Sequence, residues 1–126
     1  MNLEKVVFGF FILLAATLNF GFVYGDMTDP SVHEPWELFA AVTVSLIAAV
    51  LKFGDRTHVG AVHLAASLVA LLQLAVATVF WVVAASGDGE LSPSATASVV
   101  SLAAGALLAN IVSVVIMVIE TTMQRR

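Results

Sequence analysis

The stretch LKFGDRTHVG at residues 51–60 joins two long apolar runs, residues 36–53 and 61–85. Each run is long enough to cross a membrane as a helix, because a crossing needs about 17–25 residues. A connection this short makes the two helices antiparallel neighbours. Residues 3–24 and 94–122 form two further apolar segments. We therefore predict an all-α integral membrane bundle of four antiparallel transmembrane helices, at about 3–24, 36–53, 61–85 and 94–122, in one domain over 1–126.

The composition supports lipid as the solvent. Of the 126 residues, 60% are hydrophobic and only 11% are charged, against about 25% charged in soluble domains. A small soluble domain keeps much of its surface exposed and has no means to bury this much apolar surface. The run from Val6 to Tyr24 is too long for a cleavable signal and lacks a small-x-small site, so it reads as a retained helix.

The charges divide between the two ends of the predicted bundle. The basic residues are Lys5, Lys52, Arg56, Arg125 and Arg126, all on the side of both termini. The acidic residues of the opposite side are Asp26, Asp29, Glu34, Glu37, Asp88 and Glu90. Lys and Arg near transmembrane helices are retained in the cytoplasm. We therefore predict that both termini are cytoplasmic.

Several function classes are excluded by what the sequence lacks. There is no cysteine, so thiolate metal sites and cysteine nucleophiles are excluded. No nucleophile–base pair, phosphate-binding loop or metal motif is present, and we expect no enzyme, no cofactor and no bound metal. The basic residues are too few for nucleic acid. No charged residue lies in the middle of a helix, whereas proton-coupled transporters, including the small multidrug exporters with a carboxylate in their first helix, need one.

Small residues recur along three of the predicted helices. Residues Ala97, Ser101, Gly105, Ala109 and Ser113 recur at every fourth position. Shorter series are Ala41, Ser45 and Ala49, and Thr17, Gly21 and Gly25. In lipid, small residues let helix backbones approach closely. The series either pack the four helices on one another, or the longest of them faces a second protein.

Three amides lie within the predicted spans, at Asn19, Gln73 and Asn110. Hydrocarbon satisfies none of their hydrogen-bonding groups. Gln73 and Asn110 both lie near mid-depth, which predicts a hydrogen bond between the third and fourth helices. The alternative is a small polar path for ions or water, lined by the amides and by serines. These serines are Ser45, Ser67, Ser101 and Ser113.

The loops and helix ends offer the remaining candidate positions. His33, among acidic loop residues, is either solvated or part of a weak cation or pH-sensing site. His63 is expected near the inner interface and Asp55, and Glu120 in solvent beside the terminal arginines. The turn residues Lys52, Asp55, Arg56 and His58 are candidates for contact with a cytoplasmic partner. Ser31 with Glu34 fits a capping box, and Ser92 with Pro93 fits a helix start.

The chain resembles a family of small, uncharacterised four-helix inner-membrane proteins of Gram-negative bacteria. The resemblance rests on residues 1–5 (MNLEK), 17–22 (TLNFGF), 51–56 (LKFGDR) and the run 101–113. It implies a multi-pass protein of the bacterial inner (plasma) membrane, encoded near potassium-uptake genes. The family brings no established activity to carry over.

Two functions are consistent with these features. The leading hypothesis is an accessory or assembly subunit of a larger membrane complex, in the setting of potassium or other ion transport. Its partners are the lipid bilayer and another membrane protein or a second copy of the chain. The alternative is a homo-oligomeric ion channel or small-solute carrier.

Overall fold

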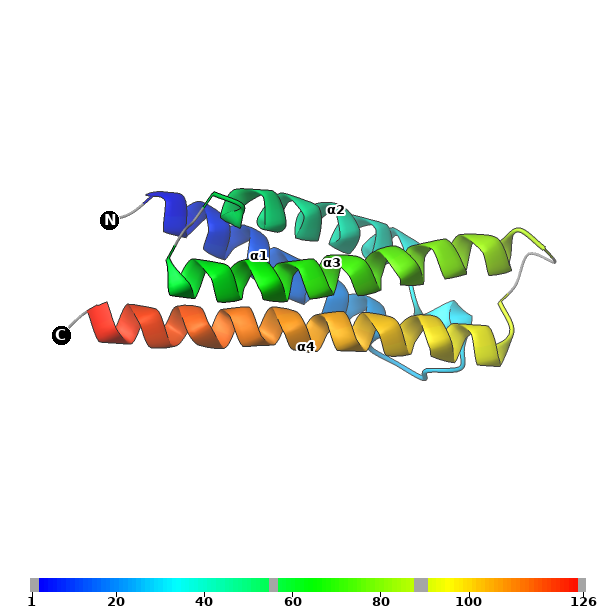
Figure 1. The fold of residues 1–126 in the computed structure, drawn as a ribbon. Helices are drawn as coiled ribbons and strands as arrows, with labels where there is room; N and C mark the ends of the chain where they lie inside the picture. Colours follow the sequence, from blue (N-terminus) through cyan, green and yellow to red (C-terminus); the bar gives the residue numbers. More distant parts are fainter. Residues whose placement is uncertain (1–2, 55–56, 88–90, 125–126) are drawn as a thin grey trace.

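The computed structural model describes residues 3–54, 57–87 and 91–124. It contains the α-helices α1 (Leu3–Val23), α2 (Pro35–Lys52), α3 (His58–Ala85) and α4 (Pro93–Gln124). A short 3-10 helix, η1 (Pro30–Val32), lies in the loop between α1 and α2 (Figure 1). The terminal arginines and the turn residues Asp55 and Arg56 lie outside the described residues.

The helices form a closed bundle in which α1 packs on α2 and α4, and α3 packs on α2 and α4. The start of α1 and the end of α4 lie at one end of the bundle, which we call the termini end, and η1 lies toward the other, the loop end (Figure 1). All four helices are long and apolar enough to cross a membrane. The chain therefore has the architecture of a small multi-pass membrane protein.

The helix boundaries follow from local hydrogen bonding. α1 ends before Gly25, whose φ of +111° is strained for any residue with a side chain. α3 begins at His58, three residues before the predicted start, because the Thr57 hydroxyl accepts a hydrogen bond from the Gly60 amide at 2.9 Å. Ser92 caps α4 as predicted, since its hydroxyl accepts from the Ala95 amide at 3.1 Å.

The predicted capping box between Ser31 and Glu34 does not form. The Asp29 carboxylate instead accepts from the Ser31 amide and caps η1. Glu34 precedes α2 without a side-chain cap, and Pro35 occupies the first turn of that helix. Proline at the first helical position has no amide hydrogen that needs a partner. The start of α2 is therefore set by proline rather than by a hydroxyl cap.

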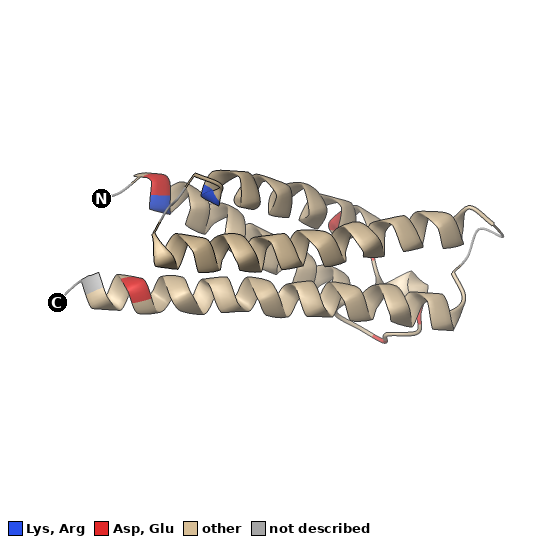
Figure 2. Ribbon diagram, in the orientation of Figure 1, with Lys and Arg blue, Asp and Glu red and all other residues tan. Residues whose placement is uncertain are grey.

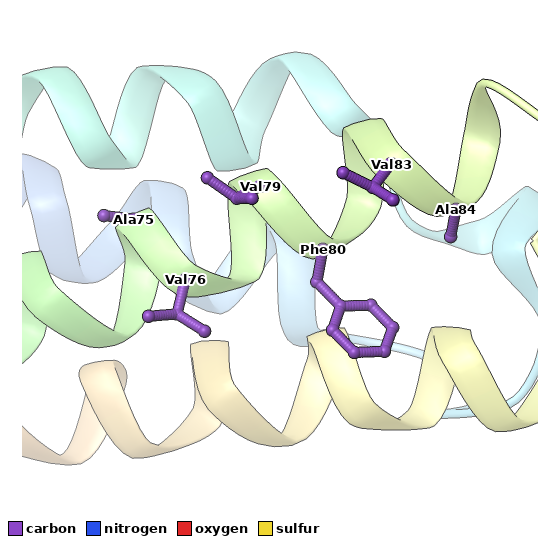
Figure 3. Close-up of a pocket in the computed structure, with 6 residues that line it drawn as sticks. All are labelled: Ala75, Val76, Val79, Phe80, Val83 and Ala84. Carbon is purple, nitrogen blue, oxygen red and sulfur yellow. The ribbon is translucent and has the colours of Figure 1, made fainter.

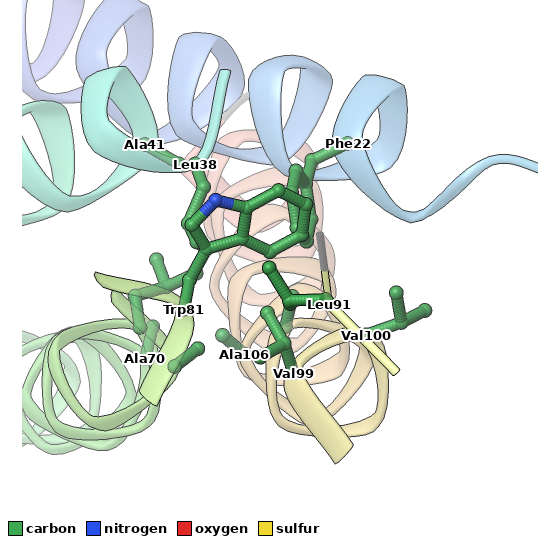
Figure 4. Close-up of a cluster of buried hydrophobic side chains, with 12 residues drawn as sticks. Phe22, Leu38, Ala41, Ala70, Trp81, Leu91, Val99, Val100 and Ala106 are labelled. Atoms are coloured by element: carbon green, nitrogen blue, oxygen red, sulfur yellow. The ribbon is translucent and has the colours of Figure 1, made fainter. Parts of the chain in front are cut away.

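The apolar core is concentrated toward the loop end. Trp81 of α3 lies among Phe22 of α1, Leu38 of α2 and Leu91, which lies at the end of the connection from α3 to α4 (Figure 4). The rings of Phe22 and Trp81 pack edge to face at a centroid distance of 5.7 Å. This aromatic cluster closes the loop end of the bundle. A smaller buried cluster at the termini end contains Phe8, Ile12 and Ala48.

Among the described residues only Lys5 and Lys52 are basic, and both lie at the termini end (Figure 2). They stand at the first turn of α1 and the last turn of α2. The described loop acids Asp26 and Asp29 lie at the opposite end. The charge asymmetry of the sequence therefore coincides with the two ends of the bundle.

The small-residue series on α4 winds from the surface into the core. Ser101 is exposed, Ala97 and Ala109 are half-buried, and Ser113 is fully buried. A spacing of four residues drifts around a helix of 3.6 residues per turn, which explains the change of face. At Gly105, a Cβ atom would overlap the Gln73 side-chain amide. Much of the series therefore packs within the bundle, and the glycine admits a polar side chain from α3.

Substitution of Gly105 by Leu should force α3 and α4 apart, because the new side chain needs the volume of the Gln73 amide. We expect a loss of about 1–3 kcal/mol of unfolding free energy, typical of overpacking. Ser101→Leu, on the exposed side of the same helix, is the matched control and should stay within about 0.5 kcal/mol. Reversible unfolding in mixed micelles measures both; equal effects would contradict this packing.

Candidate functional site

A hollow of about 570 Å³ on the described surface is lined by residues of α3 alone. Its residues are Ala75, Val76, Val79, Phe80, Val83 and Ala84 (Figure 3). None of these side chains has a polar atom, and four are exposed apolar groups of a kind that lipid chains cover in a membrane protein. This hollow offers no chemistry and is not a candidate site.

The candidate site is instead a set of polar side chains buried inside the bundle. Every helix contributes at least one: Asn19 from α1, Ser45 from α2, Ser67 from α3, and Asn110 and Ser113 from α4. Ser67 lies four residues after the buried His63, and Ser113 three after Asn110, so each pair shares a helix face. We call Asn19, Ser45, Ser67, Asn110 and Ser113 the interior polar set.

Most of these groups have no hydrogen-bond partner in the described protein. The atoms without one include Asn19 Nδ2 and Oδ1, Ser45 Oγ, Ser67 Oγ, Gln73 Oε1, Asn110 Nδ2 and Oδ1, and Ser113 Oγ. The predicted hydrogen bond between Gln73 and Asn110 is therefore wrong. The Gln73 amide lies instead against Gly105, about one helical turn nearer the loop end than Asn110.

Along the bundle axis, the interior polar set lies between two ring contacts, Phe8 with His63 and Phe22 with Trp81. Phe8 packs on His63 at a centroid distance of 5.0 Å, which fixes the level of α1 against α3 at the termini end. The residues from His63 to Trp81 rise about 27 Å along α3. Asn19 lies three residues before Phe22, hence about 4.5 Å below the aromatic cluster. The interior polar set thus follows most of the bundle interior and ends beneath Trp81.

At the termini end the four helices surround a small polar cavity of about 70 Å³. Its lining residues are Lys5, Phe8, Lys52, His63, Met117, Glu120 and Thr121. The Lys5 Nζ lies 3.5 Å from a Glu120 carboxylate oxygen, and the Lys52 Nζ lies 4.4 Å from the centre of the Phe8 ring. We call this cavity the termini-end pocket.

The structure adds partners for two residues of this pocket. Glu120 pairs with Lys5 from the first turn of α1. The terminal arginines and Asp55, the partners predicted for Glu120 and His63, lie outside the described residues. His63 is only 1% exposed and packs on Phe8. Lys52 joins this pocket, whereas His58 is exposed at the start of α3.

Of the two alternatives for His33, the solvated one is wrong, because His33 is only 1% exposed. Its Nδ1 lies 2.5 Å from the Phe22 carbonyl oxygen and its Nε2 lies 2.7 Å from the Asp26 carbonyl oxygen. Both partners are hydrogen-bond acceptors, and each ring nitrogen lies within hydrogen-bond distance of one of them. His33 therefore ties the loop to the end of α1, and the arrangement is a structural clasp without a free ring nitrogen for a metal.

The carboxylates beside His33 are held in their ionised form. Hydrogen bonds from the Thr28 amide and hydroxyl lower the pKa of Asp26. Hydrogen bonds from the Ser31 hydroxyl and amide lower the pKa of Asp29 in the same way. The positive charge of His33 adds a smaller effect in the same direction at both. Within the described residues, no group of His, Asp and Glu is arranged to hold a metal ion.

Sequence reasoning found the polar side chains of the span but missed the termini-end pocket. Lys5 and Glu120 are far apart in sequence and lie in terminal turns, where charged residues usually meet solvent. Antiparallel packing brings the first turn of α1 beside the last turns of α4. In the predicted helices, each of Lys5, Lys52, His63 and Glu120 lies within two residues of a helix end on the side of the termini. Their similar depth in the membrane was the sequence signal that could have predicted this pocket.

Replacement of His33 by Leu should loosen the loop, because the carbonyls of Phe22 and Asp26 lose their donor. Each buried carbonyl left without a partner costs about 1–3 kcal/mol. We expect a lower unfolding midpoint and faster hydrogen exchange of amides 24–34. His58→Leu removes an exposed histidine at the opposite end and serves as the control. Similar exchange in both variants would show that the clasp does not hold the loop.

Comparison with known protein families gives one match. It covers residues 32–121, which include α2, α3 and most of α4, and the matching family carries no assigned function. Comparisons with curated proteins and with solved structures gave no match. Because the matched region is well over half of the chain, the chain belongs to the family of unknown function DUF6394.

Proposed function

We propose that the protein is a small membrane carrier that binds a small, uncharged polar solute within its helix bundle. The observation that supports this function is the interior polar set, whose amides and hydroxyls are buried and lack partners in the described protein. A buried polar group without a partner is unfavourable by about 1–3 kcal/mol. A hydrated or solute-bound interior relieves this penalty at several positions together.

The chemistry of the set favours a neutral solute over an ion. Asn19 and Asn110 each leave both a donor nitrogen and an acceptor oxygen without a partner. A solute with hydroxyl or amide groups donates and accepts hydrogen bonds, and so it matches both atoms. A bare cation matches the oxygens alone. The interior polar set contains no charged residue, which also favours an uncharged cargo.

The two ends of the bundle interior differ in polarity, one being apolar and the other polar. At the loop end, the cluster of Phe22, Leu38 and Trp81 is an apolar barrier. At the termini end, the polar pocket lies beside His63, one turn from Ser67. A carrier that opens to one side at a time needs such a difference between its two ends. The proposal takes the termini end as cytoplasmic, because Lys5 and Lys52 lie there, and the membrane as a bacterial inner membrane.

Association with another membrane protein is a second candidate, and one observation favours it. Ser94, Ser98 and Ser101 are exposed on one face of α4 near the loop end. Exposed small polar residues on a membrane helix are typical of a surface that packs on another helix. This surface suits an accessory or assembly subunit of a complex, including one for potassium or other ion transport. It ranks second because Gly105 and Ser113 of the small-residue series pack inside the bundle and are not available to a partner.

Solute entry into liposomes containing only this protein tests the first function. We expect faster glycerol uptake, measured by light scattering, than in protein-free liposomes. Asn110→Leu should remove most of this increase, because it replaces the central amide by an apolar group. Ser101→Leu makes the same kind of change on the exposed side of α4 and should leave uptake intact.

Potassium flux in the same liposomes separates the carrier from an ion channel. Potassium flux without glycerol uptake would favour the channel, including the homo-oligomeric form whose path runs between copies of the chain. Uptake no faster than in empty liposomes would reject transport by this chain alone.

Cysteine crosslinking tests the second candidate, because the chain contains no native cysteine. Ser101→Cys should form crosslinked species in native membranes if α4 packs on another membrane protein or a second copy. Ser113→Cys, fully buried on the same helix, is the control and should remain uncrosslinked. Mass spectrometry of the crosslinked band distinguishes a homodimer from a complex with another protein. Equal labelling of both positions would count against a specific surface on α4.

A further inference from the structure

We propose that the termini-end pocket and the apolar groove beside it form a binding site for one anionic phospholipid. The pocket would hold the phosphate and the groove an acyl chain. This inference concerns a lipid at the membrane interface. It uses the termini-end pocket, which is also the polar end of the proposed carrier, but it does not require transport through the interior.

The pocket has the charge and the size for a phosphate group. Among the described lining residues, Lys5 and Lys52 contribute ammonium groups from two different helices, and Glu120 contributes a carboxylate. The Thr121 side chain also lines it. Its volume of about 70 Å³ exceeds the roughly 30 Å³ share of one water molecule and is compatible with one tetrahedral oxyanion. Basic pockets between transmembrane helices are a recurrent site for lipid headgroups.

An apolar groove adjoins the pocket and extends the site toward the lipid. It is lined by Val59, Ile116, Ile119, Glu120 and Met123, and its volume is about 300 Å³. Glu120 lines both cavities. The carboxylate that pairs with Lys5 therefore marks the border between the charged pocket and the apolar groove. A phosphate joined to an acyl chain matches this pair of surfaces.

The groove is the reason to prefer a lipid over free phosphate. Inorganic phosphate would use Lys5 and Lys52 but would leave the side chains of Ile119 and Met123 exposed. Both lysines stand in terminal helix turns, the depth at which long basic side chains reach lipid headgroups. The first and last helical turns are also where phosphates of a bilayer lie. The occupant is therefore expected to be an anionic lipid of the surrounding membrane.

Native mass spectrometry of the full-length protein, exchanged from detergent into defined lipid mixtures, tests the site. We expect phosphatidylglycerol to be retained in preference to phosphatidylcholine, which has no net charge. Lys5→Gln and Lys52→Gln should each lower retention about fivefold, the effect of one basic residue near anionic lipid. Glu120→Gln should raise retention, because it removes the one carboxylate among the described lining residues. Equal retention of both lipids, or no loss in the lysine variants, would overturn the proposal.

A second pair of variants tests the groove without changing charge. Ile119→Trp fills the groove and should reduce phosphatidylglycerol retention, whereas Val118→Trp, its exposed neighbour outside the groove lining, should not. Circular dichroism confirms that each variant remains helical. Inorganic phosphate added to lipid-free protein should leave the unfolding midpoint unchanged. A rise with phosphate, together with no lipid preference, would assign the pocket to free phosphate and reject the lipid.

Discussion

The structure depends on one constraint, that hydrocarbon offers no hydrogen bonds. The backbone forms helices, in which its polar groups hydrogen-bond to one another. The side chains on the outer faces of the bundle are mostly apolar and need no hydrogen bond. The interior polar set does not meet the constraint, because Asn19 and Asn110 are buried with amide atoms that lack partners. Small residues make this arrangement sterically possible. Gly105 leaves room for the Gln73 amide, and Gly21 leaves room for the Glu37 carboxylate. The bundle thus uses its glycines to admit polar groups as well as to bring backbones together.

The two ends of the bundle are closed by different kinds of contact. The loop end is closed by apolar packing around Trp81 and by the His33 clasp, which uses both ring nitrogens on backbone carbonyls. The termini end is closed by charged and aromatic contacts, Lys5 with Glu120 and Lys52 with Phe8. An apolar barrier excludes water and polar solutes, whereas exposed ion pairs contribute little stability and exchange readily with solvent. The termini end is therefore the easier end to open.

The helices were predictable because each apolar run is long and is ended by a strong local signal. Gly25 and Ser92 are such signals, and both act as expected in the structure. The loop before α2 was less predictable, because the hydrogen bond of the Ser31 amide goes to the Asp29 carboxylate, two residues away, and not to the Glu34 carboxylate. The candidate site was predictable only by residue type. Asn19, Gln73 and Asn110 stand out in an apolar run, but their rotation and partners depend on how four helices pack, which periodicity alone does not encode.

His33 and Ser101 show why exposure was the hardest property to infer. A histidine in an acidic loop looks solvated, yet the turn at Gly25 folds the loop back so that Phe22 covers the ring. A serine in a transmembrane run looks buried, yet Ser101 is exposed because the fourfold series drifts around α4. Both outcomes depend on structure longer than one helical turn: the fold of the loop after Gly25 for His33, and the drift of a four-residue spacing around α4 for Ser101. The same drift turns Ser113 inward, level with the interior of the bundle, and leaves Ser94, Ser98 and Ser101 outside it. The small-residue series therefore contributes to two surfaces, and on the inner one Ser113 adds an unpartnered hydroxyl beside the Asn110 amide.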